Sequence, residues 1–312
     1  MYEYRCYYTC KYNLYLFGER DLMRIILFIL ANLGIMVMVS LIFSLFDLDQ
    51  LFLNNGINLN LNALLIMSAV MGMAGSVISL FSSKWMAKRS MGVQLIVTPE
   101  TENEYWLYHT VEKLAEMAQL DMPEVGYFNN SSPNAFATGW NKNAALVAVS
   151  TGLLDNMTQS EVEAVLAHEI SHIANGDMVT LALVQGVVNT FVIFFAKIIG
   201  YFVDRVIFKN RRGFGVGYYI SYMAAQMVLG IIASLITLWF SRWREYYADA
   251  GAAKLSGTAN MIAALKRLQT GNSEPLADDM AAFGISGYVS GLFSTHPPLE
   301  DRIKALEEEK FL

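Results

Sequence analysis

Two of the chain's four histidines lie four residues apart, and a glutamate directly follows the first: His168, Glu169 and His172 in the stretch HEISH. The surrounding residues, 158 to 176, have the pattern of one helix. Side chains four apart project from the same helix face, so both imidazoles can bind one metal ion. Glu169 lies one step round the helix, where it can take a proton from metal-bound water. The spacing predicts zinc-dependent hydrolysis; the alternative is an amphipathic helix with two surface histidines.

A catalytic zinc ion usually has three protein ligands and one open position. The extended motif HExxHxxGxxH is absent, because Asn175 and Met178 stand where its glycine and last histidine would be. A carboxylate from residues 243–254, WREYYADAGAAK, can complete the site instead. Glu245 and Asp249 lie four apart on a helical pattern there. We expect Glu245 to bind zinc and Asp249 to hydrogen-bond a ligand histidine.

The composition indicates a membrane protein, since 54% of the residues are hydrophobic and only 16% are charged, whereas soluble domains have about 25% charged residues. Residues 25–46 and 63–83 contain no charge and are long enough to cross a bilayer as helices. Two further apolar runs cover 178–203, interrupted by Lys197, and 218–240. The later pair forms a second hairpin that either spans the membrane or inserts only partly.

This second hairpin explains how distant ligands meet. His172 shortly precedes the run that starts at Met178, and Glu245 shortly follows the run that ends at Phe240. At the helical rise, both ligands lie roughly 8 Å beyond the membrane edge. Both therefore reach a similar height on the same side of the bilayer.

Basic residues orient the hairpins. The segment between the first two runs has no Lys or Arg, whereas Lys84, Lys88 and Arg89 follow the second run, so both ends of the first hairpin are expected in the cytoplasm. The loop between the later runs also carries basic residues, against this rule: Arg205, Lys209, Arg211 and Arg212. Ligand geometry takes precedence, because one zinc ion cannot be bound from both sides of a bilayer.

Between the two hairpins the chain has the pattern of a folded α+β unit. A helix is expected over Glu102–Ala118, followed by strand-like runs at 124–129, 134–139 and 144–150, which we interpret as a small antiparallel sheet. The histidine helix then starts with a capping box and stops at a glycine; the residues concerned are Thr158, Glu161 and Gly176.

Substrate must lie extended across the metal, so a sheet edge should hold it by main-chain hydrogen bonds. The run NAFATG is our candidate for this strand, with substrate contacts at Asn134, Ala135, Phe136 and Ala137. The alternative is an ordinary structural strand.

The oxyanion of a tetrahedral intermediate needs a donor besides the metal. His296, held by two prolines in STHPPLEDRI, is our candidate for this catalytic role, whereas His109 belongs to the surface of an earlier helix. The alternatives are that His296 packs beneath a proline turn, or that Tyr246 or Tyr247 is the donor.

Four motifs occur in an order that resembles the HtpX family of bacterial membrane-bound zinc endopeptidases, relatives of the CAAX prenyl endopeptidases: PNAFATG, HEISH, REYYAD and STHPPLEDRI. The resemblance implies an α-helical membrane protein with an α+β zincin-type metalloprotease domain facing the cytoplasm. It implies one zinc ion per chain, held by His168, His172 and Glu245. It also implies a place in the bacterial inner membrane, with unfolded or membrane proteins as substrates in quality control and the stress response.

The expected organisation has five parts: a leader without function at 1–22, a transmembrane hairpin at 23–83, a cytoplasmic zincin domain at 84–177, a second hydrophobic hairpin at 178–240 and a helical part completing the zinc site at 241–312. The net charge of −6, without a basic face, argues against nucleic acid as a partner. Two other functions stay open: a membrane scaffold or transporter with a structural metal, and a zinc hydrolase of non-peptide substrates.

Overall fold

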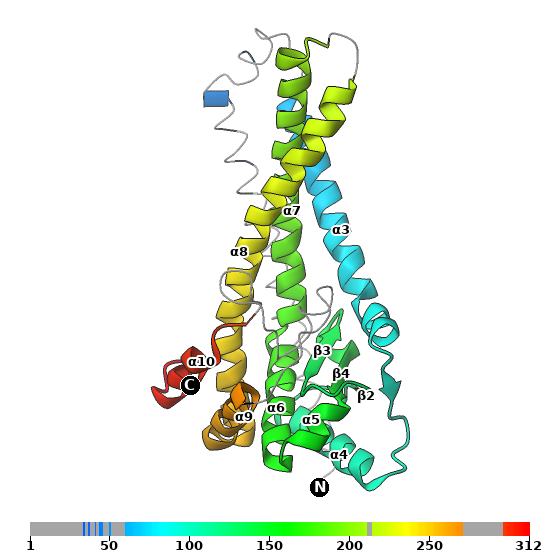
Figure 1. Cartoon of the computed structure of the whole chain (residues 1–312), viewed down its shortest axis with the longest axis vertical. Coiled ribbons are helices and arrows are strands. Elements are labelled where there is room, and N and C mark those ends of the chain that lie inside the picture. The colour runs from blue at the N-terminus through cyan, green and yellow to red at the C-terminus, as the bar shows by residue number, and fades with distance from the viewer. Residues whose placement is uncertain are drawn as a thin grey trace, which may run out of the picture. The chain divides into compact units, whose positions relative to one another are not determined.

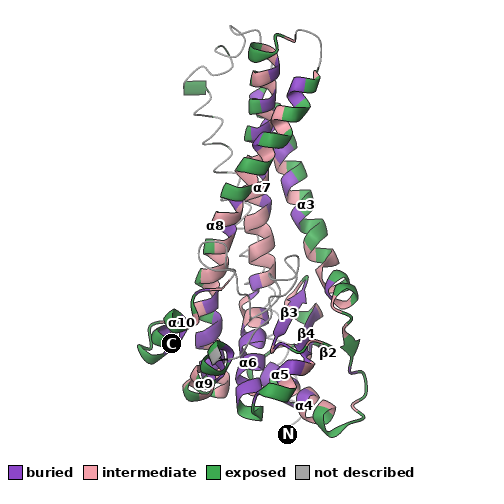
Figure 2. Ribbon diagram, viewed as in Figure 1, coloured by how far each residue is buried: buried purple, intermediate pink, exposed green. Residues whose placement is uncertain are grey.

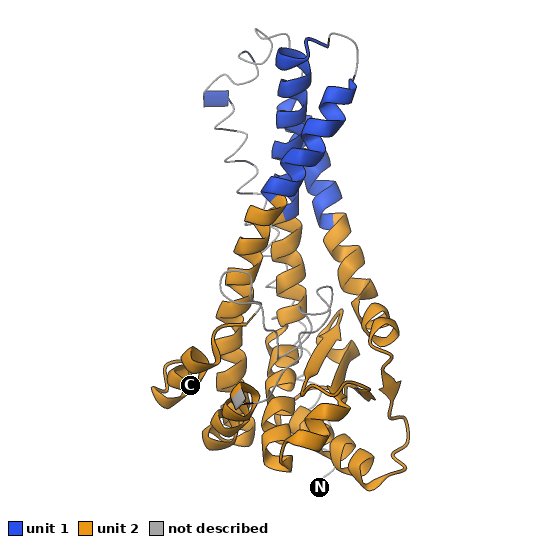
Figure 3. Cartoon of the chain, viewed as in Figure 1, with its two compact units in different colours: residues 1–73, 189–229 blue, residues 74–188, 230–312 orange. Residues whose placement is uncertain are grey.

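The computed structural model describes residues 60–210, 214–270 and 296–312, together with six isolated positions between Gly34 and Gln50. The expected leader at 1–22 lies outside the described residues, as does most of the apolar run at 25–46. The chain divides into two compact units, one formed by residues 1–73 and 189–229 and the other by residues 74–188 and 230–312 (Figure 3). The five functional parts expected from the sequence remain a prediction.

Among the described residues, three long helices are apolar enough to cross a membrane (Figure 1): α3 at Leu61–Ser90, α7 at Asp177–Phe202 with its π-helical extension Val203–Ile207, and α8 at Val216–Ser256. They coincide with the predicted run at 63–83 and with both later runs. At the helical rise, the 41 residues of α8 extend for about 60 Å, about twice the thickness of a hydrocarbon core. α8 is therefore longer than a membrane span requires, and Glu245 lies in its second half.

The sheet has four strands among the described residues, in the order β1-β2-β4-β3: β1 at Gln94–Leu95, β2 at Glu124–Phe128, β3 at Ala135–Gly139 and β4 at Ala145–Ser150. The three predicted strands are present, but the expectation of an antiparallel sheet is wrong. The β2–β4 pair is parallel, while β1–β2 and β3–β4 are antiparallel. The chain crosses from β2 to the far edge before it returns as β4, which places β4 between β2 and β3. The expected edge position of the NAFATG strand is correct.

The structure has five shorter helices among the described residues: α4 at Glu102–Met117, α5 at Thr151–Asn156, α6 at Gln159–Asn175, α9 at Thr258–Thr270 and α10 at Leu299–Glu307, with a 3-10 turn at Lys142–Ala144. The bounds of α4 and α6 are close to the predicted ones. Thr158 caps α6, and Thr158 and Glu161 form the predicted capping box. Gly176 ends the helix with a φ of 67°, a conformation that glycine adopts at little cost. Both ends of the histidine helix are thus fixed by local sequence.

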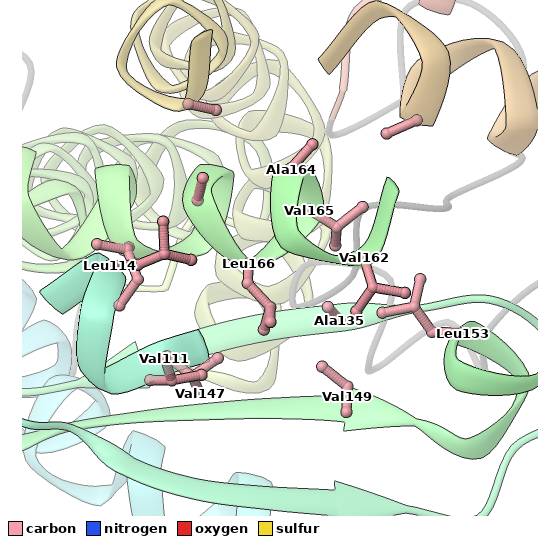
Figure 4. Close-up of a cluster of buried hydrophobic side chains, with 14 of the residues drawn as sticks. Val111, Leu114, Ala135, Val147, Val149, Leu153, Val162, Ala164, Val165 and Leu166 are labelled. Carbon is pink, nitrogen blue, oxygen red and sulfur yellow. The ribbon is translucent and has the colours of Figure 1, made fainter. Parts of the chain in front are cut away.

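The core of the α+β unit lies between α6 and the sheet (Figure 4). Val162 and Leu166 of α6 are fully buried and belong to the same cluster as Val147 and Val149 of β4. Burying a side chain of this size stabilises the fold by roughly 1.5–3 kcal/mol. Figure 2 shows buried residues concentrated in α6 and the strands, whereas exposed residues recur along α3 and α8. One face of α6 packs on the sheet, and the histidines lie on another face of the same helix, toward α8.

Candidate metal centre

Helices α6 and α8 bring together the three predicted ligands, His168, His172 and Glu245, whose ligand atoms all lie within 4.8 Å of one another. The two histidine Nε2 atoms are 3.1 Å apart. Nε2 of His168 is 3.4 Å from Oε2 of Glu245, and Nε2 of His172 is 3.3 Å from Oε1. Tetrahedral coordination at about 2.0–2.1 Å would separate ligand atoms by about 3.3 Å. The spacing therefore fits a tetrahedral metal ion.

The second nitrogen of each histidine faces a carboxylate. Nδ1 of His168 lies 2.9 Å from Oδ1 of Asp249, and Nδ1 of His172 lies 2.6 Å from Oδ2 of Asp177. These acceptors favour the tautomers that carry their proton on Nδ1, so the Nε2 lone pairs point toward each other and toward Glu245. Such an arrangement is unfavourable without a cation, which is why the residues fit a bound metal. Asp249 takes the position that the sequence predicted.

A glycine allows α8 to approach α6 this closely. A Cβ atom on Gly251 would lie 2.6 Å from Oγ of Ser171 and 2.8 Å from its Cβ. Ser171 lies beside His172 in α6, while Gly251 lies two residues after Asp249 in α8. A larger side chain would therefore push apart the helices that bear the ligands.

Glu169 lies beside this cluster and is 4% exposed. Burial raises the pKa of its carboxyl group above the usual range, and the charges of His168 and His172 oppose this effect only in part. A carboxylate with a raised pKa is a better proton acceptor than an exposed one. The position and environment of Glu169 therefore suit a general base.

The carboxylates around His168 and His172 favour the protonated form of both imidazoles. Burial is the largest single effect on His172 and opposes its protonation, but Glu245 and Asp177 outweigh it and raise its pKa to about 10. The pKa of His168 is also raised, because hydrogen bonds to Asp249 and Glu245 outweigh burial. In the absence of a metal the raised pKa values favour protonation, so a metal ion competes with protons for these histidines.

Arg302 is a site residue that the sequence did not reveal. Its side chain is fully buried, and its Nε and Nη2 atoms bind the two carboxylate oxygens of Asp249 at 2.8 and 2.6 Å. Nη2 also lies 3.5 Å from Nδ1 of His168, and Nη1 lies 3.5 Å from Oε2 of Glu245. The guanidinium group thus fixes the carboxylate that orients His168. The available signal was an arginine on the apolar face of α10, beside Ile303.

Asp177 and Arg244 form a second pair that sequence reasoning missed. Nη1 of Arg244 donates to the main-chain oxygen of Asp177 at 2.5 Å and lies 3.6 Å from its Oδ1. Asp177 directly follows Gly176, whose left-handed conformation turns the chain at the end of the histidine helix. The sequence had marked this glycine only as a helix stop.

His296 lies at the site, as predicted. Its Nδ1 atom is 2.8 Å from Oε2 of Glu245, a contact that the sequence did not predict. The rings of the alternative donors, Tyr246 and Tyr247, both pack against Phe311, with centroids 5.2 and 5.3 Å away. His109 is exposed and pairs with Glu112, consistent with a surface residue.

The candidate substrate strand is more buried than expected. Asn134, Ala135 and Phe136 are all buried, and Ala137 is half-buried. The ring of Phe136 packs on that of Phe128, with centroids 5.6 Å apart, in a separate hydrophobic cluster. Its side chain therefore belongs to the core, and only the main chain of β3 remains as a means of holding a peptide. This role stays a prediction.

The chain is similar to several known proteins over most of its length. A family model described as peptidase family M48 matches residues 101–310. The chain is 60% identical to Protease HtpX of Pseudoalteromonas atlantica over 91% of this chain and 99% of the relative. It is 56% identical to Protease HtpX of Pseudomonas putida, with the same coverage of both. The crystal structure of S. mikatae Ste24p matches in fold, with a TM-score of 0.56 and 20% identity over 78% of this chain and 58% of that one.

Proposed function

The chain belongs to peptidase family M48, and from this premise we propose that its metal is zinc, one ion per chain, held by His168, His172 and Glu245. Family membership and the relatives named Protease HtpX identify a membrane-bound metalloendopeptidase. The predicted fold class, an α-helical membrane protein with an α+β zincin-type domain, is confirmed. The resemblance noted from the sequence motifs is confirmed as well.

One observation carries the choice of zinc. Two Nε2 atoms and one carboxylate converge at separations of 3.1 to 3.4 Å, and each histidine is oriented by a carboxylate on its other nitrogen. Two imidazoles and one glutamate are a donor set typical of catalytic zinc, with a fourth position left for water or substrate. A structural zinc site would usually have four protein ligands. The donor set therefore favours catalysis over a scaffold with a structural metal.

Zinc, when bound, supplies a Lewis acid that lowers the pKa of a water molecule to about 7. The carboxylate of Glu169 accepts a proton as the water oxygen forms its bond to the scissile carbonyl carbon. The same carboxyl group then delivers that proton to the leaving amine as the C–N bond breaks. Peptide and water thus become an acid and an amine, and Glu169 returns to its starting state.

We assign the second oxyanion donor to His296. Its imidazole lies at the edge of the ligand set, against Glu245, and can donate a hydrogen bond from a ring N–H to the tetrahedral oxyanion. Two residues serve as positioning groups: Asp249 orients His168, and Arg302 fixes Asp249.

An extended peptide is proposed to pair with the main chain of β3 between Asn134 and Ala137. The support is topological, since β3 is an edge strand among the described strands and packs against α6, which carries the histidines. Main-chain pairing recognises extended polypeptide rather than sequence. Such recognition suits misfolded chains, in which segments become extended.

The proposed biological role is the cleavage of misfolded or damaged membrane proteins in the bacterial inner membrane, with the active site facing the cytoplasm. Lys84, Lys88 and Arg89 at the end of α3 support this orientation through the positive-inside rule. The three apolar helices support the bilayer location.

The direct test is proteolysis by the full chain purified in detergent, with casein as an unfolded substrate. Cleavage should stop when a chelator removes the metal and return on addition of zinc to the metal-free protein. Cleavage that persists in the metal-free protein would contradict the proposal. Recovery with other divalent ions but not with zinc would contradict the choice of metal.

A further inference from the structure

An exposed aromatic cluster, formed by Phe81, Trp85 and Trp140, lies where the end of α3 meets the β3–β4 turn. The three residues are 58%, 62% and 43% exposed. The rings of Phe81 and Trp140 are in contact, with centroids 5.4 Å apart. Exposed large aromatic residues that gather in this way mark interaction surfaces.

The position of Phe81 along α3 indicates how deep the aromatic cluster lies in the bilayer. Phe81 belongs to the last turn of the charge-free run that ends at Ser83, and Lys84 is the first charged residue after it. A ring in contact with Phe81 therefore lies at the boundary between hydrocarbon and headgroups. Tryptophan prefers this boundary, because its ring is apolar while its N–H needs a polar partner. Trp140, whose ring contacts Phe81, is therefore placed where tryptophan is favoured.

The β3–β4 turn is held against α3. Gly139 has a φ of 155°, and a Cβ atom there would lie 2.7 Å from the main-chain oxygen of Ala144, so the turn before Trp140 requires glycine. Nζ of Lys84 donates to that same oxygen of Ala144 at 3.4 Å. Both Lys84 and Lys88 also form ion pairs with Glu124 of β2. Side chains of α3 thus hold the turn before β4 and the start of β2.

The surroundings of the cluster are positively charged. The end of α3 and the β3–β4 turn carry four basic residues, two of which, Lys84 and Lys88, pair with Glu124: Lys84, Lys88, Arg89 and Lys142. The guanidinium group of Arg89 lies over the ring of Trp85, 5.8 Å from its centroid. Basic residues beside interfacial aromatic residues match a surface of anionic lipid headgroups.

We propose that the β3–β4 turn docks into the headgroup layer of an anionic bilayer through Trp140, Phe81 and Trp85. The turn anchors one end of β3 at the membrane surface. A further consequence rests on the proposed function: a peptide paired with β3 leaves the bilayer beside Trp140. The preferred substrates are then polypeptides tethered to the membrane in which the enzyme is embedded.

Tryptophan fluorescence tests the anchor without any measurement of activity. The full chain is reconstituted into vesicles of phosphatidylcholine and phosphatidylglycerol whose acyl chains carry bromine near the headgroup. Trp140→Phe should lower the fraction of emission that bromine quenches, because an interfacial emitter is removed. Trp106→Phe is the matched control: Trp106 packs against the protein core, so its removal should raise that fraction. An equal or higher quenched fraction in Trp140→Phe than in the wild type would overturn the anchor.

Cleavage tests the consequence for substrates. Trp140→Ser should lower kcat/KM for an unfolded polypeptide tethered to the same vesicles by about tenfold, the loss expected for one aromatic anchor, while casein in solution is cleaved as before. Tyr105→Ser, which removes an exposed aromatic residue from α4, should change neither rate. Equal losses on both substrates, or no loss on either, would overturn the preference. A wild type that cleaves neither substrate would contradict the proposed function, while the quenching result would still test the anchor.

Discussion

Nδ1 of His172 lies 2.6 Å from Oδ2 of Asp177, the first residue of α7. Arg244, which directly precedes Glu245 in α8, holds Asp177 through its main-chain oxygen. The Asp177–Arg244 pair thus connects His172, the start of α7 and the residue that precedes Glu245 in α8. The geometry of the metal site therefore depends on how the start of α7 packs against the part of α8 that carries Glu245.

Asp177→Ala should weaken metal binding by about 10–100-fold, the usual cost of losing a carboxylate that orients a ligand histidine. Competition with a chromogenic chelator measures this affinity directly. Asp177→Asn keeps an acceptor without the charge and should lie between the wild type and the alanine variant. Unchanged affinity in Asp177→Ala would show that His172 is oriented by other means.

Glu169→Gln should retain zinc while kcat falls by roughly 10²–10⁴-fold, because the amide cannot accept the water proton. Metal analysis and casein cleavage on the same preparation separate the two effects. Glu163→Gln alters a more exposed carboxyl group of the same helix and serves as the control. Substantial cleavage by Glu169→Gln would remove Glu169 from the mechanism.

Zinc binding to the metal-free chain at pH 7.5 should release protons. The pKa of His172 is raised to about 10 without metal, so its imidazole is protonated at this pH and must lose a proton to bind zinc. Apparent affinity should therefore rise as the pH increases toward 10. Calorimetric titrations in buffers of different ionisation enthalpy measure the protons released, and a heat independent of the buffer would contradict the assignment.

His296→Ala should keep zinc and lower kcat by about 10²–10³-fold with little change in KM, as expected when an oxyanion donor is lost. The contact with Glu245 gives the experiment a second informative outcome. If the variant loses zinc, His296 supports the ligand rather than the oxyanion. If the variant keeps the wild-type kcat, a residue other than His296 is the oxyanion donor.

Arg302→Met should destabilise the fold by about 3–5 kcal/mol, since it leaves the buried carboxylate of Asp249 without its charged partner. Lys304→Met, on the exposed side of the same helix, removes only a surface pair with Glu308 and should cost less than about 1 kcal/mol. Urea unfolding in detergent, followed by circular dichroism, compares the two. Similar midpoints would show that Arg302 is not required for stability.

Local spacing was enough to predict which residues gather at the candidate metal centre. His168, His172, Glu245 and Asp249 all follow from intervals of four residues on helices, and the two later apolar runs indicated how the helices meet. The caps at Thr158 and Gly176 are also local signals, and the structure confirms both.

The remaining features depend on pairing between distant segments. Alternation along a strand shows which side chains share a face but not which strand lies beside it, so the parallel pairing of β2 with β4 could not be predicted. Arg302 reaches Asp249 from a helix 53 residues further along the chain. Asp177 is near His172 in sequence, yet it contacts the imidazole only because Gly176 turns the chain.

The zinc content of Glu245→Ala tests the account most directly, because this substitution removes only the ligand from α8. The full chain and the variant are purified in detergent, dialysed against the same weak chelator and analysed for metal per chain. Glu112→Ala, which changes an exposed carboxyl group on α4, is the control. We predict about one zinc per chain for the wild type and control and very little for Glu245→Ala, since two imidazoles alone form an incomplete site. Full occupancy in Glu245→Ala would contradict the proposed metal centre.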